Sequence, residues 1–141
     1  MSVTSLEWDT SKLADGVYIV KVIASDRLAN PGDPRQAEAV SRPLVVDNTP
    51  PELVVDSGRK DTDQPPAEIA VSDRTTYVTS AEFRIDTGPW LAAMAKDGIF
   101  DQRTETILLD AARIPPGAHQ IEIRARNAAG NTAKVTLRYT K

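Results

Sequence analysis

The residue types that carry out catalysis are scarce in this sequence, and their spacing points away from an enzyme. The single histidine is His119, and nucleophilic catalysis needs a base of this kind beside its nucleophile. No serine stands in a G-x-S-x-G elbow, and the chain has no cysteine to act as nucleophile. His119 falls at an inward-facing position of an expected strand, so we interpret it as structural. The sequence predicts no catalytic residue.

Paired acidic side chains are a second possible source of catalysis. Asp61 and Asp63 are close enough in sequence to suggest the paired carboxylates of a glycosidase. They lie in a polar loop before Pro65-Pro66, however, and such a pattern is typical of a solvated turn. We therefore predict no acid–base pair here.

Calcium is the stronger alternative, because it binds carboxylate and carbonyl oxygens. Asp47-Asn48, just before Pro50-Pro51, resembles the calcium-binding linkers of cadherin repeats, and Asp26 approaches it if the strand ends converge. The loop Asp97-Gly98 to Asp101 is also rich in oxygen ligands but lacks the spacing of an EF-hand. A shell of about six to eight oxygens does not assemble from these residues, and turn-forming Asp and Asn explain both segments. The sequence predicts no metal and no cofactor, and a calcium-stiffened adhesive repeat stays open as an alternative.

Carbohydrate binding would use an exposed aromatic ring as a flat platform. Trp8 and Trp90 are the two tryptophans. Trp8 aligns with an apolar strand position of the repeat described below, so we expect it in a core. Trp90 follows the turn Gly88-Pro89; its exposure beside a groove would favour an accessory binding module for carbohydrate or a cell-surface polymer, and its burial would favour a structural role.

Composition excludes further classes of function. The 141 residues carry 17 Lys and Arg against 20 Asp and Glu, a formal charge of 17 − 20 = −3. The basic residues are interspersed with acids, so no nucleic-acid footprint is present. No apolar run approaches the roughly 18 residues of a membrane span. With 40% apolar residues, the chain can bury a core without disulfides.

A repeat organises the chain. The pattern of residues 8–30 recurs 117 − 16 = 101 positions later without a gap. Each copy contains an apolar residue, a short turn with glycine, an alternating strand and a small or polar turn, which indicates the same β-corner occurring twice. The matching pairs are Asp9 with Asp110, Gly16 with Gly117, Ala24 with Ala125 and Asn30 with Asn131.

Alternation of apolar and polar residues predicts an all-β fold. Seven short strands within about 90 residues are typical of an immunoglobulin-like β-sandwich, here at 52–141. The expected strands lie at 53–55, 67–71, 81–85, 90–95, 106–109, 118–126 and 133–139.

The first 47 residues do not supply a complete sandwich. About three strands are expected there, at 3–8, 17–25 and 44–46, with a Pro/Gly-rich loop at 30–35. By the repeat they correspond to the last strands of a preceding, incomplete module, as if the chain were cut from a longer protein. Residues 48–51 form a Pro-rich junction, since paired prolines resist helix and stiffen a linker. An unpaired apolar face invites strand pairing, so we expect docking onto the complete domain or self-association through residues 1–47.

The corner Leu13-x-Asp15-Gly16-x-Tyr18 resembles the tyrosine corner of fibronectin type III and other immunoglobulin-like domains. The resemblance implies that the Tyr18 hydroxyl reaches back to the backbone, and His119 replaces this tyrosine in the second copy. The segments 41–51, 83–101 and 116–131 resemble modules of large secreted bacterial proteins. The resemblance implies an extracellular or cell-envelope location and neighbouring domains as partners, but no activity. We therefore expect a non-catalytic structural spacer or protein-interaction module, without nucleic-acid binding or membrane insertion.

Overall fold

The protein is all-β, as the sequence predicts, and it divides into two compact units after Asp47. The computed structural model describes residues 5–55 and 68–140. The first unit ends at Asp47 and the second begins at Asn48. The acidic loop with Asp61 and Asp63 lies outside the described residues.

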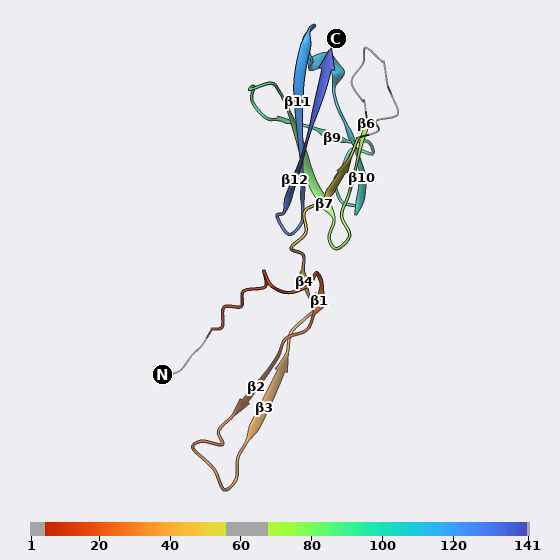
Figure 1. The fold of residues 1–141 in the computed structure, drawn as a ribbon. Helices are drawn as coiled ribbons and strands as arrows, with labels where there is room; N and C mark the ends of the chain where they lie inside the picture. The colour runs from red at the N-terminus through yellow and green to blue at the C-terminus, as the bar shows by residue number, and fades with distance from the viewer. Residues whose placement is uncertain (1–4, 56–67, 141) are drawn as a thin grey trace. The chain divides into compact units, whose positions relative to one another are not determined.

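The second unit is a sandwich of two antiparallel four-stranded sheets (Figure 1). The strands within each sheet run in the orders β5-β6-β10-β9 and β12-β11-β7-β8. Their bounds are β5 Glu52–Val54, β6 Glu68–Ser72, β7 Val78–Ile85, β8 Leu91–Ala92, β9 Met94–Ala95, β10 Thr104–Leu108, β11 Ala118–Asn127 and β12 Thr132–Thr140.

The core lies between the two sheets and is built by strict alternation. Along β11, Ile121, Ile123 and Ala125 are buried, whereas the residues between them point to the other face. Each fully buried large aliphatic side chain contributes roughly 1.5–3 kcal/mol to folding. The largest fully buried apolar side chains are Phe83, Ile69, Ile107, Ile114, Ile121, Ile123, Val71 and Val78.

The chain changes sheets within the segment predicted as one strand at 90–95. Two short strands replace it, because β8 pairs with β7 while β9 pairs with β10. Ala93 lies between them, buried, and its amide donates to the carbonyl of Ala81 at 3.0 Å. A single strand would have kept residues 90–95 in one sheet, so the crossing at Ala93 corrects that prediction.

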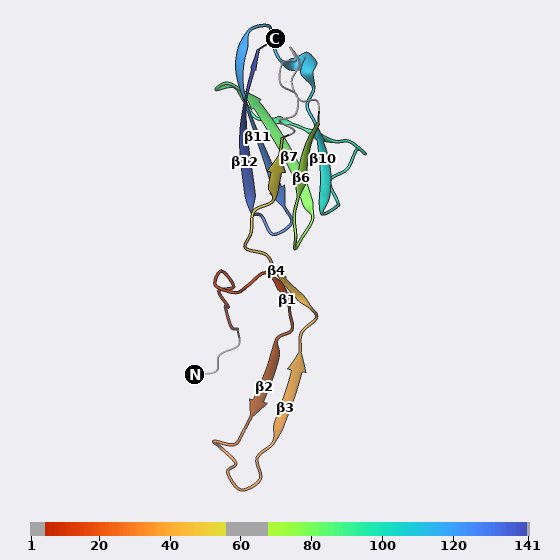
Figure 2. The ribbon, with the colours of Figure 1, turned by 45° about the vertical axis from the view of Figure 1, so that its right-hand side comes forward.

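The first unit consists of two separate strand pairs. β1 (Gly16–Tyr18) pairs with β4 (Leu44–Val46), and β2 (Lys21–Ser25) pairs with β3 (Gln36–Val40). Figures 1 and 2 show β2 and β3 as a two-stranded ribbon.

Three sequence predictions in the first unit need correction. The strand expected at 17–25 is interrupted at residues 19–20, so that its halves pair with different partners. β3 was missed, although its residues Gln36–Val40 alternate, because they follow directly on a Pro/Gly-rich loop. Of the strand expected at 3–8, the described residues 5–8 have no strand structure.

The two units differ in how well they cover equivalent side chains. Val22 on β2 is 56% exposed, whereas Ile123, its counterpart 101 positions later, is 0% exposed. Val17, Ile19, Ile23 and Val40 are also more than half exposed. The second unit thus has a closed core, while the strands of the first unit leave apolar side chains in solvent.

Candidate functional site

The single histidine lies at the start of β11, where it is held by an aspartate from the end of β7. His119 Nδ1 is 2.8 Å from Asp86 Oδ2, and the Asp86 carboxylate also accepts the amide proton of Gln120 at 2.8 Å. The side chain of His119 is 15% exposed. No serine, threonine or lysine of the described residues forms a hydrogen bond with the imidazole.

The imidazole is biased toward its protonated form. The hydrogen bond to Asp86 raises the pKa of His119, burial opposes this, and the nearby carbonyls of Pro116 and Pro115 favour the proton further. His119 Nε2 is buried and completes no hydrogen bond within the described residues. The pKa of Asp86 is lowered in turn, by the Gln120 amide first and by His119 second.

The first copy of the corner has a tyrosine in this place. The Tyr18 hydroxyl donates to the carbonyl of Ala14 at 2.7 Å, so it does reach back to the backbone four residues earlier. Ala14 is the counterpart of Pro115, since 14 + 101 = 115. The backbone carbonyls of Pro116 and Pro115, which favour the proton on His119, belong to the same part of the second corner.

Trp90 lies against the face of the sheet β12-β11-β7-β8 that points away from the core. We call this surface the outer face. Its residues near Trp90 are Ser80, Glu82, Arg84, Glu122, Arg124, Arg126, Thr132 and Lys134, and Gln120, Thr136 and Arg138 continue it along β11 and β12. The indole centroid is 4.1 Å from the guanidinium carbon of Arg124, 4.8 Å from that of Arg84 and 5.8 Å from Lys134 Nζ. Trp90 is half-buried. Full exposure would have favoured a binding module and full burial a structural role, so its exposure alone does not separate the two.

Two ion pairs cross neighbouring strands beneath the indole. Arg124 Nε is 2.6 Å from Glu82 Oε2, and Arg84 reaches Glu122 Oε2 at 2.7 Å. Both pairs join residues that lie directly opposite each other on β7 and β11. They fix the two guanidinium groups in the plane on which Trp90 rests.

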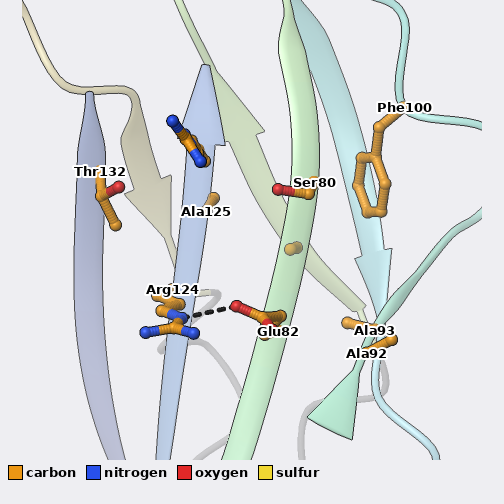
Figure 3. A pocket seen from close by; sticks show the side chains of 10 residues that line it. Ser80, Glu82, Ala92, Ala93, Phe100, Arg124, Ala125 and Thr132 are labelled. Carbon is orange, nitrogen blue, oxygen red and sulfur yellow. Dashed lines mark hydrogen bonds and ion pairs between the residues drawn. The ribbon is translucent and has the colours of Figure 1, made fainter. Parts of the chain in front are cut away.

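A cavity of about 550 Å³ opens on the outer face beside this cluster. Figure 3 shows Ser80 and Glu82 on β7, Arg124 on β11 and Thr132 on β12 around it, with Phe100 and Ala93 at its rim. Arg126 also lines the cavity, and within the described part of the chain no carboxylate lies at ion-pair distance from it. The sequence indicated only that these residues lie on a solvated strand face. Because β7 lies about 40 residues before β11, the sequence alone does not show that their side chains meet at one cavity.

Three acidic side chains do converge in the loop that the sequence marked as rich in oxygens. Asp97, Asp101 and Glu105 each place one carboxylate oxygen within 4.8 Å of the others. Glu105 Oε1 already accepts the amides of Asp101 and Gln102, at 3.0 and 2.9 Å. Asp97 accepts the amide of Ile99. These bonds are those of a tight turn.

The other calcium candidates are held apart. Asp26 follows β2 at the end where Ser25 pairs with Gln36, whereas Asp47 follows Val46, which pairs with Gly16. Asp26 instead closes its own loop, accepting the Arg35 amide at 2.6 Å and the Asn30 side-chain amide at 3.0 Å. Asp26 and Asp47 therefore do not converge on one site.

Trp8 is not the core residue that the repeat predicted. It is 47% exposed and meets Tyr18 edge to face, with ring centroids 6.4 Å apart. Its counterpart Leu109 is buried. The difference follows from the missing strand at residues 5–8, which leaves no sheet to bury the indole.

A buried polar network at the base of the sandwich was not anticipated from the sequence. Asn127 is 1% exposed; its Nδ2 donates to Asp73 Oδ2 at 2.9 Å and to the carbonyl of Thr49 at 3.1 Å, while its Oδ1 accepts the amide of Asn131. Asp73 Oδ1 accepts two backbone amides of the next turn. Burial alone would raise the pKa of Asp73, but the bonds from Asn127 and from these amides outweigh it and lower that pKa.

Comparisons with protein-family models, with characterised proteins and with solved structures find no match to this chain. The part of the chain that the structure describes holds no helix with the length and apolar character of a membrane span.

Proposed function

We propose that the chain is a non-catalytic structural spacer and interaction module of an extracellular bacterial multidomain protein. The observation that carries this proposal is the network around Asn127, because it ties the junction to the sandwich. A spacer sets the distance and angle of its neighbours only if the chain leaves the domain in a fixed direction. The carbonyl of Thr49 is bonded to Asn127, and Pro51, two residues later, is buried. Pro50 and Pro51 have restricted φ, so the junction has few conformations.

The strand order supports the immunoglobulin-like part of the proposal. Sheets of order β5-β6-β10-β9 and β12-β11-β7-β8 correspond to strands A-B-E-D and G-F-C-C′ of that architecture. The hydroxyl bond from Tyr18 to Ala14 is of the kind found at its tyrosine corners. The extracellular bacterial setting rests on the resemblance of segments 41–51, 83–101 and 116–131 to modules of large secreted bacterial proteins.

The exposed strands of the first unit support an interaction role. Val17, Ile19, Val22, Ile23 and Val40 are each more than half exposed. In the second unit the counterpart of β2 lies within β11, which has a strand on both sides. The partners that fit β2 and β3 are therefore further strands, from a neighbouring domain of the same protein or from a second copy of this chain.

Distance measurements between the two units test the spacer function. The chain lacks cysteine, so it can be labelled without background. A double variant with one cysteine at Ala39 and one at Thr136, both exposed positions, carries one spin label in each unit. We expect a narrow distance distribution that broadens when Pro50 and Pro51 are replaced by glycine. As a control, a cysteine pair at Ala70 and Thr136 lies entirely within the sandwich. Its distance distribution should be the same with and without the proline replacements. A distribution that is already broad before the prolines are replaced would refute the spacer function.

A further inference from the structure

We infer that the outer face of the sandwich binds an acidic polysaccharide, one whose sugar rings carry uronic-acid carboxylates, at the cavity between Trp90 and Arg126. This inference goes beyond the proposed function, because a spacer needs no ligand. It depends on three features of the outer face: its charge, its aromatic platform and the place of the cavity on the sheet.

The charge of the outer face is opposite to that of the chain. Near Trp90 and the cavity it contains four basic side chains and two acidic ones, for a balance of 4 − 2 = +2, in a protein of net charge −3, and Arg138 adds a fifth basic side chain further along β12. Both acids are used in the pairs Glu82–Arg124 and Glu122–Arg84. Arg126 at the cavity and Lys134 beside Trp90 have no carboxylate partner among the described residues. The two cations left over are therefore available to carboxylates of a ligand, and a guanidinium binds a carboxylate with two parallel hydrogen bonds.

Trp90 adds an aromatic surface next to these cations. Arg84, Arg124 and Lys134 all project from the sheet, so the cations contact the indole from the sheet side. Arg124 both stacks on Trp90 and lines the cavity, so one side chain connects the ring to the cavity, which the ring itself does not line. The C–H groups of a pyranose ring pack against a fixed aromatic face of this kind, and the loss of side-chain freedom on binding is small because the indole is already held.

The position of the cavity favours a saccharide over an acidic peptide. Extended peptides bind sheets by adding a strand at an edge, where backbone groups are unpaired. This cavity instead lies against β11, a middle strand that is paired with β12 on one side and with β7 on the other. The hydroxyl groups of Ser80 and Thr132 and the carboxylate of Glu82 line it, and these groups can bond to sugar hydroxyls.

Binding to alginate and to polygalacturonate, two polymers of uronic acids, tests the inference with the full chain. Affinity electrophoresis and calorimetry at physiological ionic strength should detect binding to at least one of them and none to neutral dextran. We expect Arg126→Ala to weaken that binding about tenfold, the loss that corresponds to one charge-assisted hydrogen-bonded pair. Trp90→Ala should abolish it, and Trp90→Phe, which keeps a ring, should retain part of it.

Arg138→Ala is the matched control. Arg138 lies on β12 opposite Gln120. It is four residues along the strand from Lys134, which pairs with the cavity residue Arg124, and thus roughly 13 Å from the nearest edge of the cavity, so its replacement removes the same charge elsewhere on the same sheet. Its affinity should change less than about twofold. An equal loss of affinity in Arg126→Ala and Arg138→Ala would show that the polymer is held by general charge attraction, and it would refute a specific site at the cavity. Failure to bind either polymer would overturn the inference, as would equal binding of poly-glutamate, which would assign the cavity to acidic peptides. The distance measurements on the junction are independent of all these outcomes.

Discussion

Individual polar side chains in this protein fasten turns to strands. Tyr18 and His119 occupy the same place in the two copies of the corner. The Tyr18 hydroxyl donates to the carbonyl four residues earlier, and the carbonyls of Pro116 and Pro115, three and four residues before His119, favour the proton on its ring. A hydroxyl always carries its proton there, whereas His119 Nε2 carries one only when the ring is protonated. The replacement of tyrosine by histidine therefore makes this contact of the second corner dependent on pH.

The single histidine makes this dependence directly measurable. We expect the imidazole resonance of His119 to titrate above the ordinary value of about 6.5, and Asp86→Asn to bring its pKa back toward that value. Asp86 has a positive φ of 52°, which asparagine tolerates, so this variant removes charge without straining the turn. A titration of the wild type at or below 6.5 would show that Asp86 does not hold the proton.

The sign of the effect on stability follows from the raised pKa. The contribution of protonated His119 is fully present below about pH 6.5, its value in the unfolded chain, and it is lost as the pH rises through the higher folded value. The Tm difference between wild type and His119→Gln should accordingly be larger near ~pH 5.5 than near ~pH 8.5. Thermal melts of both proteins across this range provide the measurement, and a difference that grows toward alkaline pH would contradict the assignment.

The sequence predicts some contacts of individual side chains and not others. The reach of Tyr18 back to the backbone follows from its corner, and it is confirmed by the bond to Ala14. The partner of His119 does not follow, because Asp86 is 33 residues away and meets it only through the register of β7 with β11. Local spacing carries no information on such a register.

Secondary-structure elements are joined at the base of the sandwich by Asn127, at the end of β11. Replacing it with alanine leaves the buried Asp73 carboxylate with one bond fewer, and it removes the partly buried bonds to the Thr49 carbonyl and the Asn131 amide. We expect Asn127→Ala to lower the free energy of unfolding by about 2–4 kcal/mol, measured by urea denaturation. Thr136→Ala, an exposed change on the neighbouring strand, should stay within about 0.5 kcal/mol. A loss for Asn127→Ala no greater than that control would show that the network does not stabilise the domain.

The turn into β11 depends on one glycine. Gly117 has a φ of +119°, which residues with a side chain rarely adopt, although an added Cβ would meet its nearest neighbour only at 3.7 Å. The cost of Gly117→Ala is thus conformational, and we expect a loss of about 1–3 kcal/mol in urea denaturation. Ala118→Ser, at the next and exposed position, should be nearly neutral. Equal stability of the two variants would mean that the turn relaxes to an ordinary conformation.

Elements with regular alternation are those that the sequence predicts well. β6, β7, β11 and β12 were expected from alternating apolar residues, and their inward positions are buried or partly buried. The change of sheets at Ala93 was missed because a two-residue strand is too short for alternation to be visible. The cavity and the Trp90 cluster were missed for a different reason, since they require β7 and β11 to be neighbours.

At the scale of the whole molecule, one unit has a closed core and the other does not. The repeat makes the contrast quantitative, because Val22 is 56% exposed where Ile123 is fully buried. Strands with exposed apolar residues pair with other strands when these are available. A version of the chain limited to residues 49–141 keeps every strand of the sandwich and its core, and we expect it to be a folded monomer.

The full chain, by contrast, should self-associate through β2 and β3, with a sedimentation coefficient that rises with concentration. Two substitutions on β2 locate the contact. Val22→Lys charges the face that is buried in the repeat counterpart and should yield a monomer, because a lysine cannot be covered by a second apolar strand face without a partner. Ile23→Lys introduces the same charge on the opposite face, where the counterpart Arg124 is already basic, and should leave association largely intact. Equal effects of the two variants would show that the association does not use the core face of β2, and a full chain that stays monomeric at all concentrations would refute self-association through residues 1–47.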